Sequence, residues 1–185
     1  MKKIISIVVL FFLPVSATLA ATVYFSPAGF SGSIGQVFSL HIMGDFTPGE
    51  MIEGGGLNLA FDGLVVNVTN ISVNTTLFDF YSDPGTIDNP NGTVTDIVFN
   101  TFAGASGIFR IATVDFNAVG LGSTALILTE SSLNPFSSAV AMESLTVGFQ
   151  SSSVMVAAVP LPATAWLFGS GLGIFGAFLK KRRAT

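Results

Sequence analysis

The stretch VFSLHIM at residues 37–43 alternates between apolar and polar side chains. Successive side chains of a β-strand point to opposite faces, so Phe38, Leu40 and Ile42 share one face of an extended chain. A strand that buries one face and shows the other to water is typical of an antiparallel sheet. These residues therefore predict a half-buried strand, with His41, the single histidine, on its water-facing side.

The same period of two recurs along the chain, with inward-facing positions at Leu57, Leu59 and Phe61, at Leu64, Val66 and Val68, and at Leu126 and Leu128. Residues typical of turns separate the runs, at 29–35, 45–56, 82–92, 103–107 and 119–123. Helical periodicity is absent. This pattern predicts an all-β fold: one domain at residues 22–158, built as an antiparallel sandwich of about nine strands.

The N-terminal end has the three parts of an export signal. Two lysines follow Met1, an apolar run spans residues 4–13, and small residues surround a cleavage point after Ala20 or Ala21. The alternative is an uncleaved membrane anchor, but ten apolar residues are short for a membrane span. The sequence thus predicts a signal peptide at residues 1–21 and an exported protein.

The C-terminal end, residues 159–185, predicts a membrane segment with a fixed orientation. It begins with a proline-bearing entry, Val159, Pro160, Leu161, Pro162 and Ala163. Residues 163–179 carry no charge and are just long enough for one transmembrane helix. The basic cluster that follows should stay in the cytoplasm and hold the preceding chain outside; it consists of Lys180, Lys181, Arg182 and Arg183.

This tail resembles the PEP-CTERM family of bacterial sorting signals, in the variant that reads VPLPA at residues 159–163. The resemblance implies that an exosortase, an integral-membrane enzyme, recognises and removes the tail. It further implies an inner-membrane precursor, followed by release to the cell surface or extracellular matrix of a Gram-negative-type bacterium, in association with exopolysaccharide.

Charge is distributed unevenly along the chain. All eleven acidic residues but only one basic residue, Arg110, lie between residues 22 and 158, so this part carries a formal charge of −10 against −4 for the whole chain. Nucleic acids and anionic lipids are bound through lysine and arginine, so this composition argues against both as ligands. The chain has no cysteine, which excludes thiol catalysis and thiolate metal sites.

Two segments of the predicted domain resemble cohesin domains. In residues 56–71, followed by Phe78, a strand ending in Phe-Asp turns into the next strand; residues 111–128 hold two strands joined by a glycine-bearing corner. At this corner Phe116 should pack inward while Gly120 and Gly122 allow a tight turn. The resemblance implies a nine-stranded jelly-roll sandwich and, as in cellulosomal cohesins, a binding face on an exposed sheet that takes a dockerin.

Residues 79–96 contain many oxygen donors that could bind Ca²⁺. The candidate ligands are Asp79, Asp83, Asp88 and Asp96. Their spacing is not that of an EF-hand, so ordinary polar-loop chemistry is the favoured interpretation. Asp62 is expected to cap the turn after Phe61 through its carboxylate.

Catalytic motifs are missing from the sequence. One histidine without cysteine cannot build a His-rich zinc site, and no Gly-X-Ser-X-Gly elbow accompanies His41. Carboxylates abound, yet no motif selects a pair for glycoside hydrolysis. We therefore expect a non-enzymatic surface or matrix protein without a cofactor. The alternative is a module that binds carbohydrate or a surface protein, with or without Ca²⁺.

Overall fold

The computed structural model describes residues 21–46, 50–141 and 143–158, together with Phe168. The predicted transmembrane helix, sorting motif and basic cluster, and the signal peptide up to Ala20, lie outside these residues. No helix among the described residues is long and apolar enough to cross a membrane.

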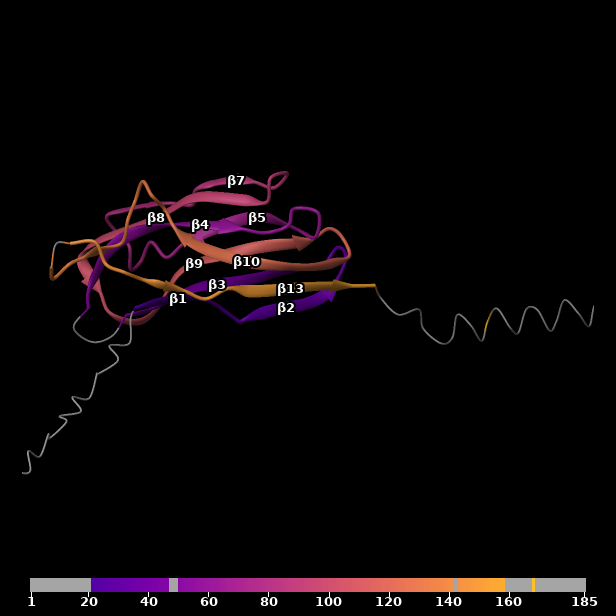
Figure 1. Ribbon diagram of the computed structural model, residues 1–185, viewed down its shortest axis with the longest axis horizontal. Helices are drawn as coiled ribbons and strands as arrows, with labels where there is room; N and C mark the ends of the chain where they lie inside the picture. Colours follow the sequence, from indigo (N-terminus) through magenta and orange to yellow (C-terminus); the bar gives the residue numbers. More distant parts are fainter. Residues whose placement is uncertain (1–20, 47–49, 142, 159–167, 169–185) are drawn as a thin grey trace, which may run out of the picture.

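The described ranges between residues 21 and 158 form thirteen strands and no helix (Figure 1). In chain order they are β1 (Thr22–Ser26), β2 (Gly29–Ser33), β3 (Val37–Phe46), β4 (Ile52–Ala60), β5 (Val66–Val73), β6 (Tyr81–Asp83), β7 (Thr86–Asp88), β8 (Thr93–Ala105), β9 (Gly107–Ala118), β10 (Gly122–Glu130), β11 (Ser137–Ser138), β12 (Gly148–Phe149) and β13 (Ser152–Ala157).

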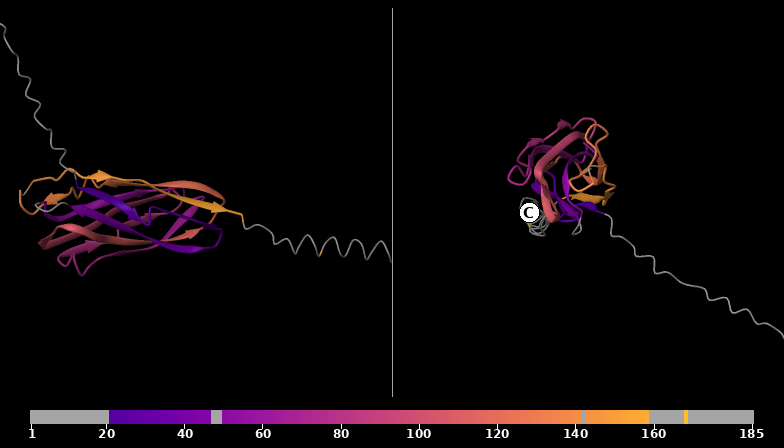
Figure 2. Two further views of the ribbon diagram at one scale, coloured as in Figure 1. Left: turned by 90° about the horizontal axis from the view of Figure 1, so that it is seen from below. Right: turned by 90° about the vertical axis from the view of Figure 1, so that its left-hand side faces the viewer.

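The strands make two sheets that pack face to face, as Figure 2 shows from two sides. The five-stranded sheet has the order β12-β1-β3-β9-β5. The eight-stranded sheet has the order β2-β13-β10-β4-β8-β6, with β11 beside β4 and β7 beside β8. The expected all-β sandwich is therefore confirmed.

Strand number and direction differ from the prediction. Nine strands have five residues or more, and the other four, β6, β7, β11 and β12, have two or three. Two pairs are parallel rather than antiparallel, β1 with β12 and β2 with β13. These pairs join strands from the two ends of the chain, so no hairpin turn has to connect them and either direction is allowed.

Phenylalanine rings fill the core at both ends of the sandwich. Phe38, near the start of β3, stacks between Phe30 and Phe116, with ring centroids 3.7 and 5.2 Å away. At the other end of the same strand, Phe46 lies 5.4 Å from Phe109 and 6.4 Å from Phe136. Strand β3 therefore contributes a ring to each end of the core.

The turn after β4 explains where the predicted alternation fails. The carboxylate of Asp62 accepts a hydrogen bond from the Leu64 backbone N–H at 2.8 Å, which confirms the expected cap. The Asp62 carbonyl also accepts from the N–H groups of Val65 and Val66. This tight turn breaks the period of two, so the prediction that Leu64 faces the core is wrong: Leu64 is 83% exposed and Val65 is buried.

Several segments predicted as turns belong to strands instead, among them residues 86–88, which form β7, and residues 103–105, which end β8. Residues 29–33 form β2, and residues 52–56 form the first half of β4. The three consecutive glycines of β4 serve close packing: a Cβ at Gly55 would lie 2.9 Å from the ring of Phe136, and one at Gly56 2.7 Å from the Cβ of Asn134. Because the segment after β10 crosses β4 here, side chains are excluded from a regular strand.

The described chain begins and ends at opposite ends of the sandwich (Figures 1 and 2). Ala21 is buried, and its carbonyl accepts a hydrogen bond from the Gly148 N–H at 2.8 Å. Of the two expected cleavage points, the one after Ala20 keeps this contact. Strand β13 leaves the sandwich at the far end, where it pairs with the start of β10.

Polar side chains on the outer face of the five-stranded sheet link three neighbouring strands, β3, β9 and the edge strand β5. Asp115 on β9 accepts hydrogen bonds from the Ser39 hydroxyl of β3 at 2.6 Å and from the Asn70 amide of β5 at 3.0 Å. These two bonds, and to a lesser extent the nearby His41, hold the pKa of Asp115 below its ordinary value. His41 itself lies 3.0 Å from the Thr113 hydroxyl and is half-buried on this face, on the side predicted for it.

The corner between β9 and β10 has the expected construction. Phe116 is fully buried. A Cβ at Gly120 would collide with the carbonyl oxygen of Leu64, and Gly122 has a φ of 138°, which disfavours a side chain. The corner therefore depends on glycine for a close backbone approach and for an unusual backbone angle.

Replacing Asp115 with asparagine should lower the free energy of unfolding at pH 7 by about 1 kcal/mol or less, because exposed charged hydrogen bonds are screened by water. Folding lowers the pKa of Asp115, so its stabilisation is present above the unfolded pKa of about 3.9 and is lost as the pH falls through the folded value. In urea unfolding, the difference from wild type should therefore shrink below about pH 4. Asp45→Asn is the control for loss of charge, because Asp45 lies on the outer face of the neighbouring strand β3. An equal loss of stability in the two variants would contradict the account.

Replacing Gly120 with alanine should destabilise the protein by about 1–3 kcal/mol, since the new methyl group would overlap backbone that cannot rotate away. Gly148→Ala is the matched control, because a Cβ there meets its nearest atom at 3.5 Å, an ordinary contact. Thermal unfolding of both variants measures the difference. Equal stability of the two variants would show that the corner does not need glycine.

Candidate functional site

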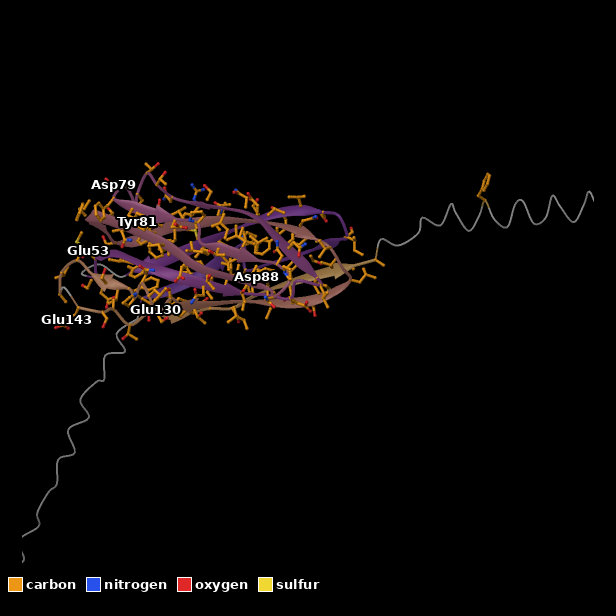
Figure 3. All side chains as sticks on the ribbon, turned by 90° about the horizontal axis from the view of Figure 1, so that it is seen from above. Glu53, Asp79, Tyr81, Asp88, Glu130 and Glu143 are labelled. Carbon is orange, nitrogen blue, oxygen red and sulfur yellow. The ribbon has the colours of Figure 1, made fainter. Side chains whose placement is uncertain are left out.

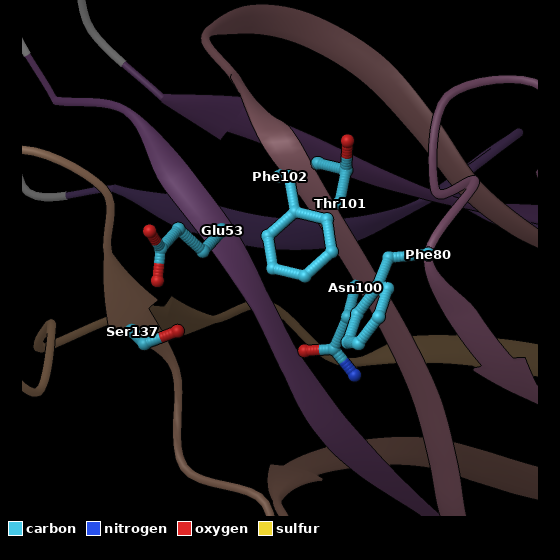
Figure 4. Close-up of a pocket in the computed structure, with 6 residues that line it drawn as sticks. All are labelled: Glu53, Phe80, Asn100, Thr101, Phe102 and Ser137. Carbon is cyan, nitrogen blue, oxygen red and sulfur yellow. The ribbon is translucent and has the colours of Figure 1, made fainter.

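A hollow of about 150 Å³ opens on the outside of the eight-stranded sheet (Figure 4). Four elements contribute its lining: β4, the chain before β6, β8 and β11. The lining residues are Glu53, Phe80, Asn100, Thr101, Phe102 and Ser137. This hollow lies at the end of the sandwich opposite to the exit of β13, since it sits at the start of β4 and near the end of β8.

The period of strand β8 decides which side chains reach the hollow. Phe99 and Thr101 are buried, whereas Asn100 is half-buried and Phe102 is exposed. Phe99 and Phe102 are three residues apart and therefore point to opposite faces of one strand. One ring enters the core, where it lies 5.6 Å from the ring of Phe136, and the other stands on the surface.

Two phenylalanine rings form the apolar part of the hollow. Phe80 is 59% exposed and Phe102 is 78% exposed, yet their centroids are only 4.0 Å apart with the ring planes tilted by 46°. Tyr81, next in the chain, is 54% exposed and pairs with Asn100 across β6 and β8. Grouped aromatic rings left open to water mark a surface that gains free energy when a ligand covers it.

Hydrogen bonds hold this aromatic pair in place. The Phe80 N–H donates to the Asn100 carbonyl at 3.2 Å, which fixes the chain before β6 against β8. The Thr101 hydroxyl, nearly buried beside Phe102, donates to the Asp79 carboxylate at 2.9 Å. Both rings are thus attached to a hydrogen-bonded sheet, and the surface exists before any ligand arrives.

Polar groups surround the rings. Figure 4 shows the carboxylate of Glu53, the amide of Asn100 and the hydroxyl of Ser137 around the hollow. Together they offer an acceptor-only group, an amide that both donates and accepts, and a hydroxyl that does either. The hollow therefore combines an aromatic surface with mixed hydrogen-bonding capacity at its edge.

The four aspartates considered as possible Ca²⁺ ligands do not form a metal-binding group in the structure. No group of three or more His, Cys, Asp or Glu residues within the described ranges could hold a metal ion. Figure 3 shows Asp79 near one end of the molecule and Asp88 well away from it. The calcium hypothesis for this loop thus lacks the geometry that it needs.

Each of these carboxylates accepts a hydrogen bond from another part of the protein instead. Asp83 accepts from the Gly85 N–H at 2.8 Å. Asp88 accepts from the side chain and backbone of Asn91, and these bonds lower its pKa. Asp96 accepts from the Ser131 hydroxyl, where the segment after β10 meets β8. These residues shape turns and strand contacts.

The aromatic hollow itself was not predicted from the sequence. Its rings come from positions 80 and 102, which meet only because β6 pairs with β8 in the folded chain. A signal was nevertheless present: Phe99 and Phe102 are three positions apart, so in any strand that contains both, one ring faces outward.

No protein-family model matches the sequence, and comparison with curated proteins gives no match. Solved structures do match. The non-cellulosomal cohesin of the archaeon Archaeoglobus fulgidus gives a TM-score of 0.58 at 13% identity, over 75% of this chain and 92% of that one. The seventh ScaB type I cohesin of Pseudobacteroides cellulosolvens gives 0.58 at 16% identity, over 77% and 96%.

The third ScaC cohesin of Acetivibrio cellulolyticus, solved in complex with the ScaB dockerin, gives a TM-score of 0.57 at 21% identity, over 75% of this chain and 99% of that one. At these identities the likeness concerns the fold alone. The described body of this chain is a cohesin-like β-sandwich, as the two sequence segments predicted.

Proposed function

We propose that this chain is an exported, non-enzymatic protein of the cell surface or extracellular matrix, whose cohesin-like sandwich serves as an adhesive binding module. An exosortase would remove its C-terminal tail at the membrane. The observation that carries the binding role is the open aromatic hollow formed by Phe80 and Phe102 on the outer face of the eight-stranded sheet.

The position of the hollow supports this role. Strand β13 runs toward residue 159, the start of the proposed sorting signal, and leaves the sandwich at the end remote from the hollow. Before the tail is removed, a precursor held at the membrane through its C-terminus would therefore present the hollow outward. The VPLPA motif, the uncharged run and the basic cluster supply the attachment.

A protein partner is the second candidate for the binding role. The ScaC cohesin with a similar fold was solved with a dockerin bound, and exposed aromatic side chains are common anchors in protein interfaces. A specific protein interface buries about 800 Å² on each side, so such a partner would have to cover much more of the sheet than the hollow.

Processing can be tested by intact mass measurement of the mature protein recovered from the cell surface. We expect its N-terminus at Ala21, because Ala21 is buried and hydrogen-bonded to Gly148, and its C-terminus near residues 160–162. Replacing Lys180, Lys181, Arg182 and Arg183 with glutamine should impair membrane retention or orientation while leaving the ectodomain folded.

Arg110→Gln is the control for these substitutions, since Arg110 is the one basic residue between residues 22 and 158 and is exposed on β9. It should be processed like the wild type. A mature surface form that still ends in Lys-Lys-Arg-Arg-Ala-Thr would contradict exosortase sorting and leave a tail-anchored membrane protein.

A further inference from the structure

We propose that the hollow lined by Phe80 and Phe102 is a subsite for one neutral hexopyranose unit of a matrix polysaccharide. This inference rests on the adhesive function proposed above and specifies its ligand. It is carried by the exposed rings, the polar groups at their edge, the size of the hollow and the charge around it.

The rings provide the apolar contact that a sugar needs. The face of an aromatic ring is negatively polarised, and a pyranose with equatorial hydroxyls carries weakly positive axial C–H groups on its faces. Phe102, with 78% of its surface exposed, offers such a face to solvent. Phe80 contacts this ring, with ring centroids 4.0 Å apart, so the two rings form one continuous apolar surface.

The polar groups match the hydroxyls of a sugar. Each sugar hydroxyl donates one hydrogen bond and accepts others, so neighbouring hydroxyls are best bound by groups of mixed character. The Asn100 amide can donate and accept, the Glu53 carboxylate accepts, and the Ser137 hydroxyl does either (Figure 4). No hydrogen bond to another described residue engages these three side chains, so they are available to a ligand.

The volume of the hollow indicates one unit of a longer chain. Pockets that enclose a whole small molecule measure about 300–1,000 Å³, whereas this hollow holds about 150 Å³ and is open at the surface. A single ring fits, and the polymer can continue across the sheet on both sides. A free monosaccharide would make the same contacts but few others.

The charge of the surroundings selects a neutral polymer. Glu53 lines the hollow and Asp79 is bonded to its Thr101 wall. Between residues 22 and 158 the chain carries eleven carboxylates and one arginine. Polysaccharides that carry carboxylate or sulfate groups are repelled by such a surface, whereas neutral polysaccharides are not.

The test uses the full chain in a zwitterionic detergent that has no sugar headgroup. The protein is run on native gels that contain polysaccharides extracted from the matrix of the producing organism. One gel contains the neutral fraction of these polysaccharides and another the acidic fraction. We expect the neutral fraction to retard the wild type and the acidic fraction to leave it unaffected. Phe102→Ala removes the more exposed ring. This variant should therefore need a polysaccharide concentration at least about tenfold higher for the same retardation as the wild type.

Two matched variants separate stacking from general effects. Leu64→Ala removes an exposed apolar side chain outside the hollow and should behave as the wild type. Phe102→Trp keeps an aromatic face and should retain binding. Retardation of Phe102→Ala equal to that of the wild type, stronger retardation by the acidic fraction, or no retardation by the neutral fraction would each overturn the proposal.

The same variants are scored for surface location by their accessibility to added protease on intact cells. If the protein reaches the surface but is not retarded by the neutral fraction, the result contradicts the sugar subsite and leaves the proposed surface role in place. A protein that is retarded in the gel but never reaches the surface contradicts the surface role and leaves the subsite standing.

Discussion

Packing of the two sheets against a shared set of phenylalanine rings is the interaction on which the rest of this structure depends. Phe38 on β3 stacks with Phe30 and Phe116 at one end, and Phe136 meets Phe99 at the other, with ring centroids 5.6 Å apart. Every long strand must turn one face to these rings, which produces the period of two. Without cysteine or a metal cluster among the described residues, this burial is the main source of stability.

The same packing also creates the outer surface. To insert Phe136 into the core, the segment after β10 has to cross β4, and Gly55 and Gly56 make room for it. This crossing brings Ser137 beside β4, at the edge of the hollow. Strand β8 sends Phe99 inward and Phe102 outward, so the hollow stands directly over one end of the aromatic core.

Much of the fold was predictable because it depends on local alternation. The apolar faces at residues 37–43 and 126–128 and the cap at Asp62 follow from neighbouring residues, and the structure confirms them. Leu64 was misplaced because a hydrogen-bonded turn interrupts the alternation. The binding surface escaped prediction because Glu53, Phe80, Phe102 and Ser137 are far apart in the sequence and meet only through strand pairing.

The central claim is that this sandwich binds its ligand on the outer face of the eight-stranded sheet, at the end remote from β13. The most direct test is nuclear magnetic resonance of the protein with ¹³C-labelled phenylalanine rings, titrated with neutral oligosaccharides released from the matrix. The account predicts shifts of the exposed rings Phe80 and Phe102, with little change at the buried Phe116. Shifts confined to residues of the five-stranded sheet, or spread evenly over the core, would contradict it.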